Sequence, residues 1–220
     1  GPICMVVIYS IVSGNNMPMK HENNFKNSLP VFLSADDFHA PFVGPCVCSI
    51  CENTNENITF YVMERLMGNR NKRKIMNLCN KYENCEIKFI SVTDEDLNHA
   101  QTRCGLSTSA FPRLLIPDLC PEIDRAIYLD VDIIATGDIK KLWDQDLGDH
   151  VVGFAFGHHG IDFTHIKARE GISDPHEYFN SGVMLVNCVK WRNMGLTKKL
   201  FDVEYKTRDI RVHNDQSVLN

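Results

Sequence analysis

Two carboxylates one residue apart, Asp130 and Asp132, follow an apolar run and form the sharpest chemical feature of the sequence. A buried strand ending just before them would present both side chains at its carboxyl end, where a bend in the backbone lets them reach one cation. Carboxylate oxygens suit Mg²⁺ or Mn²⁺, and such a cation is usually shared with a diphosphate. The pair therefore predicts a metal site that offsets the charge on a departing nucleoside diphosphate. Because Asp-x-Asp is a common pattern, a solvated acidic turn is the alternative.

A second acidic pair, Asp36 and Asp37, follows an apolar run and offers acceptors for a base N–H or for ribose hydroxyls. Arg113 lies in an otherwise apolar segment, where its guanidinium is a candidate clamp for a phosphate or a carboxylate. A surface arginine whose stem lies along apolar neighbours is the alternative for Arg113. Both features add groups suited to binding a nucleotide.

Polar residues also interrupt the last part of the sequence. Asn180-Ser181-Gly182 lies within an apolar run, which indicates close approach of the backbone to a ligand or, alternatively, a β-bulge. Asp215 and Gln216 belong to a polar stretch at the start of a predicted helix, where an N-cap is the alternative interpretation.

Alternating strands and helices are expected to position these groups. The first half predicts strands over 29–34, 58–63 and 86–92, and helices over 42–51 and 69–82. The second half predicts a helix over 111–119, strands over 125–132, 151–156 and 178–187, and a helix over 189–205 that is broken near Gly195. Pro45 is expected in the first turn of its helix. The pattern indicates an α/β fold with a mainly parallel sheet flanked by helices, and ligands beyond the carboxyl ends of its strands.

The composition is that of an ordinary globular protein: 220 residues, 44% of them hydrophobic, with a net charge of −5. The negative charge argues against a nucleic-acid partner. The apolar run from Ile3 to Val12 is too short to span a bilayer, which needs about 20 residues. We expect residues 1–29 to be a tag scar followed by a flexible or appended segment, and residues 30–220 to form one domain.

Nine cysteines are expected to be reduced, buried small hydrophobes, because their number is odd and they lie inside apolar runs. Cys48 and Cys51 have the spacing of a zinc or redox pair, but no second pair follows at metal-binding spacing. A structural role is therefore favoured for them, and the compartment is expected to be a reducing cytosol.

The ordered motifs of the chain resemble glycosyltransferase family 8, which includes glycogenin and the bacterial lipopolysaccharide galactosyl- and glucosyltransferases. The resemblance covers residues 30–220, and the bacterial lipopolysaccharide branch is the most similar. It rests on motifs at residues 33–37 (LSADD), 111–119 (FPRLLIPDL), 125–134 (RAIYLDVDII), 138–143 (DIKKLW), 178–187 (YFNSGVMLVN), 190–192 (KWR) and 215–216 (DQ).

The resemblance implies a GT-A fold, a UDP-sugar donor, Mn²⁺ with Mg²⁺ as the alternative, and transfer with retention of configuration. By position, Asp130 and Asp132 would ligate the metal. Gln216 would lie at the anomeric carbon and Asp215 would bind the sugar, which makes them the catalytic candidates. The other donor-binding residues implied by position are Ala35, Asp36, His39, Arg113, Val131, Asn180, Ser181 and Gly182.

Three departures from the family pattern qualify these roles. Phe38-His39 replaces the usual Asn-Tyr, so His39 would pack on the uracil ring. Ser217 stands where an acidic residue often follows Asp-Gln, which removes one candidate nucleophile. The sequence ends at Asn220, before the family's later His-x-x-Gly-x-Lys-Pro-Trp segment, which supplies a third metal ligand and a lysine for the diphosphate. We therefore expect a domain that is incomplete at its C-terminus.

Together these residues favour a metal-dependent retaining hexosyltransferase that moves galactose or glucose from a UDP-sugar to a glycan or lipopolysaccharide acceptor. Since no second carboxylate is found beside Gln216, front-face attack fits better than a covalent intermediate. A catalytically impaired nucleotide-sugar-binding protein and a phosphohydrolase are the alternatives. A cytoplasmic location is expected, at most in peripheral contact with the inner face of the membrane.

Overall fold

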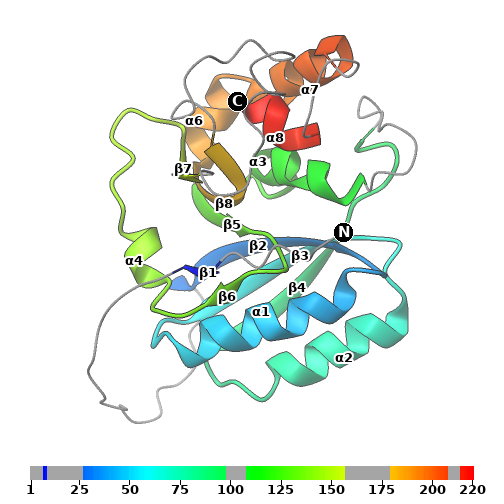
Figure 1. Ribbon diagram of the computed structural model, residues 1–220, viewed down its shortest axis with the longest axis vertical. Coiled ribbons are helices and arrows are strands. Elements are labelled where there is room, and N and C mark those ends of the chain that lie inside the picture. The colour runs from blue at the N-terminus through cyan, green and yellow to red at the C-terminus, as the bar shows by residue number, and fades with distance from the viewer. Residues whose placement is uncertain (1–6, 9–26, 98–107, 157–178, 208–213) are drawn as a thin grey trace. The chain divides into compact units, whose positions relative to one another are not determined.

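The structure is a computed structural model that describes residues 7–8, 27–97, 108–156, 179–207 and 214–220 (Figure 1). The chain divides into two compact units. The first comprises Gly1–Ser91 and Leu129–Asp146, and the second comprises Val92–Tyr128 and Leu147–Asn220.

The first unit is built on three parallel strands, β2 (Leu29–Asp36), β3 (Ile58–Arg65) and β4 (Cys85–Ser91), in the order β4-β3-β2. The middle of β2 is fully buried, as are most apolar residues of β3. Strands that are apolar on both faces are typical of a parallel sheet covered by helices. The three strands predicted from the sequence are confirmed, each within two residues of its expected start.

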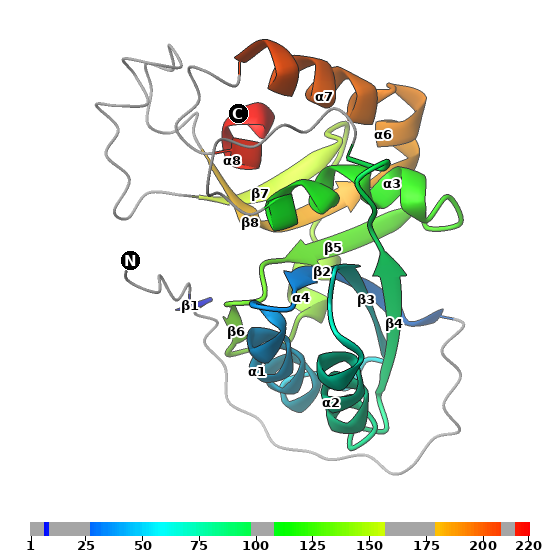
Figure 2. The same ribbon diagram turned by 90° about the vertical axis from the view of Figure 1, so that its right-hand side faces the viewer.

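Two helices, α1 (Ala40–Glu52) and α2 (Asn69–Cys79), connect these strands and pack side by side on one face of the sheet (Figure 2). Helix α1 begins two residues earlier than predicted, so Pro45 lies inside the helix and not in its first turn. That expectation was wrong because Pro41 takes the early position, where a missing N–H costs nothing. Close packing of the helices depends on Gly44, whose missing Cβ would lie 3.0 Å from Leu78 Cδ2.

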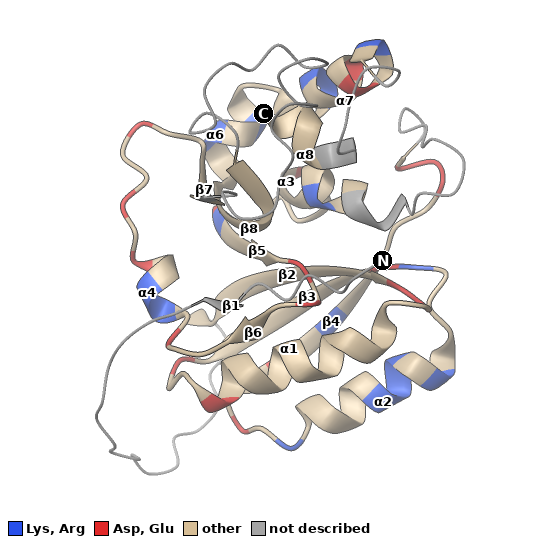
Figure 3. Ribbon diagram, in the orientation of Figure 1, with Lys and Arg blue, Asp and Glu red and all other residues tan. Residues whose placement is uncertain are grey.

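Helix α2 buries one narrow face and exposes a basic one. Ile75 and Cys79 are buried, while Arg70, Arg73 and Lys74 are exposed. Figure 3 shows the Lys and Arg positions gathered along this helix. The helix predicted over 69–82 is therefore confirmed for Asn69–Cys79, and its basic side is the solvated face.

A disulfide joins Cys79, the last residue of α2, to Cys85, the first residue of β4. The expectation that all cysteines are reduced was wrong for this pair, because the short connection brings their Cα atoms to 6.0 Å. Among the described residues the other cysteines form no disulfide, and no group of three or more metal-ligating side chains is found. The zinc interpretation of Cys48 and Cys51 thus has no support there. The described cysteines outside a disulfide are Cys46, Cys48, Cys51, Cys120 and Cys188.

Removing this disulfide is expected to destabilise the first unit modestly. For so short a loop, chain entropy assigns the cross-link about 2 kcal/mol. The double variant Cys79→Ser/Cys85→Ser should therefore unfold at a lower urea concentration than the oxidised wild type. Reductant should lower the wild-type midpoint to a similar extent and leave the variant unchanged. Equal midpoints for oxidised wild type and variant would contradict the assignment.

The first unit is completed by short elements after β5 (Arg125–Leu129). Strand β6 (Ile134–Ala135) pairs in parallel with β1 (Val7–Ile8), and helix α4 (Lys140–Trp143) comes next in the chain. The predicted strand over 125–132 ends at Leu129, so both carboxylates of the acid pair lie in the turn beyond it.

The second unit combines the strand order β5-β8-β7 with helices. Strands β7 (Val152–Phe156) and β8 (Phe179–Asn187) are antiparallel, with an irregularity between Phe154 and Ala155. The predicted break near Gly195 is confirmed: its φ of +59° separates α6 (Cys188–Asn193) from α7 (Leu196–Thr207). Helix α8 (Asn214–Leu219) lies where the final helix was predicted.

For one segment of this unit, the predicted type of secondary structure was wrong. Residues 111–119 were expected to form one helix, but the segment consists of a 3₁₀ helix, η2 (Thr108–Leu115), followed by the short α3 (Ile116–Leu119). Pro112 and Pro117 each lack a backbone N–H, which prevents a continuous α-helical ladder. Across the described residues of both units, no helix has the length and hydropathy needed to cross a membrane.

Candidate functional site

The acid pair lies in a tight turn, residues 130–132, which we call the acidic turn. The Ile133 N–H donates to the Asp130 carbonyl at 3.4 Å and closes it. Between the two carboxylates, Val131 is buried at 8% exposure, whereas Asp132 is exposed and Asp130 is half-buried. The apolar residue thus anchors the turn in the core and leaves the two carboxylates on either side of it.

Both carboxylates act on one buried group of helix α1, the thiol of Cys46. Burial raises the pKa of Cys46 to about 12, and the negative charges of Asp132 and Asp130 add to the rise. The two carboxylates are one residue apart in a single turn, on either side of the buried Val131. Two oxygen donors held together in this way fit a hard divalent cation. The described residues supply no cluster of three such ligands, so the acidic turn accounts for two.

Asp36 and His39 form a second group, at the carboxyl end of β2. One Asp36 oxygen, Oδ1, accepts the His39 backbone N–H at 2.9 Å and lies 2.7 Å from His39 Nδ1. The His39 ring stays 36% exposed, and Phe38 stands edge-on to it at 5.1 Å. The structure therefore brings Asp36 and His39 into contact, and the carboxylate fixes the orientation of the imidazole. Ala35 is completely buried in the strand before them.

Asp37, by contrast, has a structural role that the sequence did not distinguish. Its Oδ1 accepts the Gly68 N–H at 2.8 Å and the Asn71 side-chain amide at 2.9 Å. These bonds tie the loop after β2 to the start of α2. A Cβ at Gly68 would lie 3.2 Å from Asp37 Oδ1, so the contact favours glycine there.

Glu64, at the end of β3, is a buried carboxylate that sequence reasoning missed. It is 4% exposed and stands in register with Ala35 of β2. Its oxygens accept the Lys72 ammonium at 2.6 Å and the Met67 N–H at 3.0 Å. Burial raises its pKa, but these hydrogen bonds outweigh burial and hold the pKa of Glu64 below its ordinary value. In the sequence, the one signal for a role of Glu64 was its position as an acidic residue at the end of a predicted strand.

Replacing this carboxylate gives a pH-dependent prediction. Glu64→Gln should lower the free energy of unfolding by about 1 to 3 kcal/mol at neutral pH, since Lys72 loses its charged acceptor. The folded pKa is depressed, so the contribution is complete above the unfolded pKa of about 4 and is lost as pH falls through the folded value. Urea unfolding at pH 7 and in steps to pH 3 should show the variant and wild type converging in acid. A difference independent of pH would contradict this, and exposed Glu122→Gln serves as control.

In the second unit, Arg113 and Gln216 meet at Ser181. Arg113 is 6% exposed, which excludes the surface alternative, and its Nη1 donates to the Ser181 carbonyl at 2.7 Å and lies 3.0 Å from the Ser181 hydroxyl. Its guanidinium also lies over the Tyr128 ring, 4.5 Å from the centroid. Gln216 Oε1 accepts the Ser181 N–H at 3.2 Å. Three residues predicted separately from the sequence thus form one hydrogen-bonded cluster.

The residues of β8 on either side of Ser181 form hydrogen bonds within the strand and with Asn220. Asn180 Oδ1 accepts the Gly182 N–H at 2.7 Å, a side-chain turn within the strand. Asn220 pairs with both backbone groups of Phe179, at 2.8 Å and 3.1 Å. The polar triplet at 180–182 therefore has a defined backbone, and the side chain of Asp215 lies outside the described residues.

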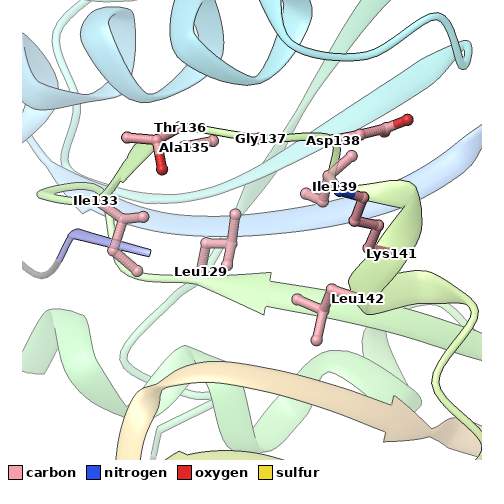
Figure 4. A pocket seen from close by; sticks show the side chains of 9 residues that line it. All are labelled: Leu129, Ile133, Ala135, Thr136, Gly137, Asp138, Ile139, Lys141 and Leu142. Atoms are coloured by element: carbon pink, nitrogen blue, oxygen red, sulfur yellow. The ribbon is translucent and has the colours of Figure 1, made fainter. Parts of the chain in front are cut away.

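A small pocket lies beside the acidic turn in the first unit (Figure 4). Its walls are mainly the apolar side chains of Leu129, Ile133, Ile139 and Leu142, with Asp138 among the polar ones. Figure 4 shows these residues coming from the end of β5, from the segment through β6, and from α4. The pocket contains neither carboxylate of the acidic turn, so it is a separate feature.

The fold is that of the GT-A glycosyltransferases, and the chain belongs to glycosyl transferase family 8, whose model matches residues 30–220. The chain is 28% identical over 195 residues to a putative glycosyltransferase of Haemophilus influenzae, and 31% identical over 193 residues to general stress protein A of Bacillus subtilis. It is 26% identical over 207 residues to a lipopolysaccharide 1,2-glucosyltransferase of Escherichia coli.

These matches cover most of this chain but a smaller share of each relative. They cover 88%, 84% and 90% of the chain, in that order, and 58%, 66% and 59% of the relatives. The chain thus spans about three fifths to two thirds of their length. Among solved structures, the galactosyltransferase LgtC in complex with donor and acceptor sugar analogues superposes with a TM-score of 0.75 at 26% identity, covering 87% of this chain and 69% of that one.

Proposed function

We propose that this protein is a metal-dependent retaining hexosyltransferase that transfers galactose or glucose from a UDP-sugar to a glycan acceptor, in lipopolysaccharide or cell-surface glycan synthesis. The observation that carries the proposal is the acidic turn, which places two carboxylates one residue apart directly after β5, in a chain of family 8. Similarity to a lipopolysaccharide glucosyltransferase and to LgtC supports the substrate class. The proposed location is the cytoplasmic side of a membrane, in at most peripheral contact with it.

The nucleotide half of the donor is assigned to the first unit. Asp36 is the proposed acceptor for uridine hydrogen bonds, next to Ala35 in β2, and His39 offers a ring for the uracil to stack on. The bonds from Asp36 to His39 fix that ring before any ligand arrives. A ring oriented in advance loses less conformational freedom on binding, which favours affinity.

The diphosphate is assigned to the acidic turn. Asp130 and Asp132 would hold Mn²⁺ or Mg²⁺, with the Val131 backbone against the donor. The cation, when bound, would neutralise negative charge that develops on the departing UDP. Because the described residues supply two metal ligands, diphosphate oxygens are expected to complete the coordination sphere.

The sugar is assigned to residues of β8 and α8. Asn180, Ser181 and Gly182 would line its pocket, and Arg113 would stabilise that wall through Ser181 while contacting the donor. Gln216, with Asp215 beside it in sequence, would face the anomeric carbon. Gln216 is an amide and cannot form the carboxylate ester that a covalent intermediate requires, so its carbonyl oxygen would stabilise positive charge during front-face attack by the acceptor.

A second candidate function is nucleotide-sugar binding without turnover. It is favoured by the two-ligand metal set, since fewer protein ligands bind a cation more weakly. The phosphohydrolase alternative is not favoured by any of the named relatives.

An assay of UDP release separates these candidates. The full chain is incubated with UDP-galactose or UDP-glucose, with and without lipooligosaccharide, in Mn²⁺ or in EDTA. The proposal expects UDP release in Mn²⁺, little in EDTA, and recovery when excess Mn²⁺ is restored. If the protein binds UDP but frees no UDP from either UDP-sugar under any of these conditions, the second candidate is established and the first is overturned.

A further inference from the structure

The acidic turn is held on both of its sides. On the N-terminal side it follows β5 directly, and Val131 is buried between the two carboxylates. On the C-terminal side, β6 contributes two residues to its pairing with β1, and a pairing of two residues is weak by itself. A second set of contacts holds this C-terminal side.

That set comes from the last turns of helix α1 and converges on Ala135. The Ala135 N–H donates to the Ser49 hydroxyl at 3.0 Å, and the Ser49 hydroxyl donates to the Cys46 carbonyl at 2.8 Å. The Asn53 side-chain amide donates to the Ala135 carbonyl at 3.2 Å and to the Ser49 carbonyl at 2.8 Å. Both backbone polar groups of Ala135 are thus held by two side chains one helical turn apart.

A second anchor lies three residues later. The Thr54 hydroxyl donates to Asp138 Oδ1 at 2.6 Å, and the same oxygen accepts the Lys140 N–H at the start of α4. The segment after the acidic turn is therefore held at Ala135 and again at Asp138. Both anchors attach at the end of α1 or directly after it.

We propose that Ser49 and Asn53 are positioning residues for the metal site: they hold the acidic turn through Ala135 so that both carboxylates stay directed to one cation. The proposal rests on the proposed function, because it takes the acidic turn as the metal site. Ligand groups must be held within about 0.5 Å for productive geometry, and residues that orient ligands typically contribute about 10- to 100-fold to metal affinity.

Binding of Mn²⁺ alone to the full chain, followed by the electron paramagnetic resonance signal of free Mn²⁺, tests this. Ser49→Ala and Asn53→Ala should each weaken Mn²⁺ binding by about 10-fold. Ser49→Thr, which keeps the hydroxyl, should bind within about 2-fold of wild type. In the UDP-release assay, both alanine variants should need more Mn²⁺ for half-maximal rate, yet approach the wild-type rate at saturating Mn²⁺.

The matched control is Asn84→Ala. Asn84 also lies at the end of α1, where its side-chain amide donates to the carbonyls of Cys51, Thr54 and Glu56 at 3.3 Å, 3.2 Å and 3.4 Å and not to Ala135 or Asp138. It should lower thermal stability without changing Mn²⁺ affinity. Since Asn53 is exposed, Asn53→Ala is the variant expected to fold even if Ser49→Ala does not.

The experiment distinguishes failure of the positioning role from failure of the proposed metal site. Wild-type Mn²⁺ affinity in both alanine variants, together with lost binding in Asp130→Asn/Asp132→Asn, would overturn the positioning role and leave the proposed function intact. Wild-type Mn²⁺ affinity in the double Asp variant would overturn the metal site and the positioning role with it. Equal weakening by Asn84→Ala would show a general effect of stability and would also overturn the positioning role.

Discussion

Replacing both carboxylates of the acidic turn, Asp130→Asn with Asp132→Asn, is expected to lower Mn²⁺-dependent hexose transfer by at least about 100-fold. The amides keep the shape of the turn but remove both negative charges that would hold the cation against the diphosphate. Removing one electrostatic stabiliser typically costs about two to three orders of magnitude in rate. The measurement is UDP release per minute at saturating donor and Mn²⁺.

The chain contains a matched control for this experiment. Asp144 and Asp146 have the same one-residue spacing in the same unit, and both are exposed. Asp144 pairs with Lys140 at 2.8 Å on the surface, an interaction of small energetic value. The variant Asp144→Asn/Asp146→Asn changes the net charge equally and should retain wild-type activity. Equal activity of the two double variants would contradict the role of the acidic turn.

The largest effect on stability is expected from Arg113. Arg113→Ala should lower the free energy of unfolding by about 3 kcal/mol, since it removes a charged hydrogen bond to Ser181 and a cation over Tyr128. Arg113→Lys keeps the charge but not the planar fork, so it should recover part of the loss. Urea unfolding monitored by circular dichroism measures both variants.

Surface arginine provides the comparison for this prediction. Arg70→Ala, on the exposed face of α2, should change stability by less than about 0.5 kcal/mol. If Arg113→Ala were as stable as Arg70→Ala, the buried cluster around Ser181 would not have the energetic role assigned to it. If it were stable but inactive, Arg113 would act mainly on the donor.

The sequence predicted the elements best where apolar patterning was strong. The strands that became β2 and β3 are mainly apolar runs, and their positions follow from burial on both faces. Prediction failed where proline and cysteine decide the local structure. Pro112 converts an expected helix into a 3₁₀ segment, and the Cys79–Cys85 bond depends on where a helix ends and a strand begins.

For the candidate site, too, local sequence patterns were enough for some residues, whereas contacts between distant residues decide the others. Residue type and position at a strand end were enough to propose Asp36, Asp130 and Asp132 as site residues. The hydrogen bonds that connect Arg113 and Gln216 through Ser181 span 68 and 35 residues of sequence, so no local pattern contains them. The partners of Glu64 and Asp37 depend on loop conformations for the same reason.

The central claim, that the acidic turn binds a cation together with a nucleoside diphosphate, is tested most directly by calorimetric titration of the full chain with UDP, with and without Mn²⁺. Metal and nucleotide that share one site must strengthen each other's binding equally. The wild type is expected to bind UDP at least about 10-fold more tightly in Mn²⁺, and Asp130→Asn/Asp132→Asn to show no such gain. The same enhancement by Mn²⁺ in the double variant would contradict the claim.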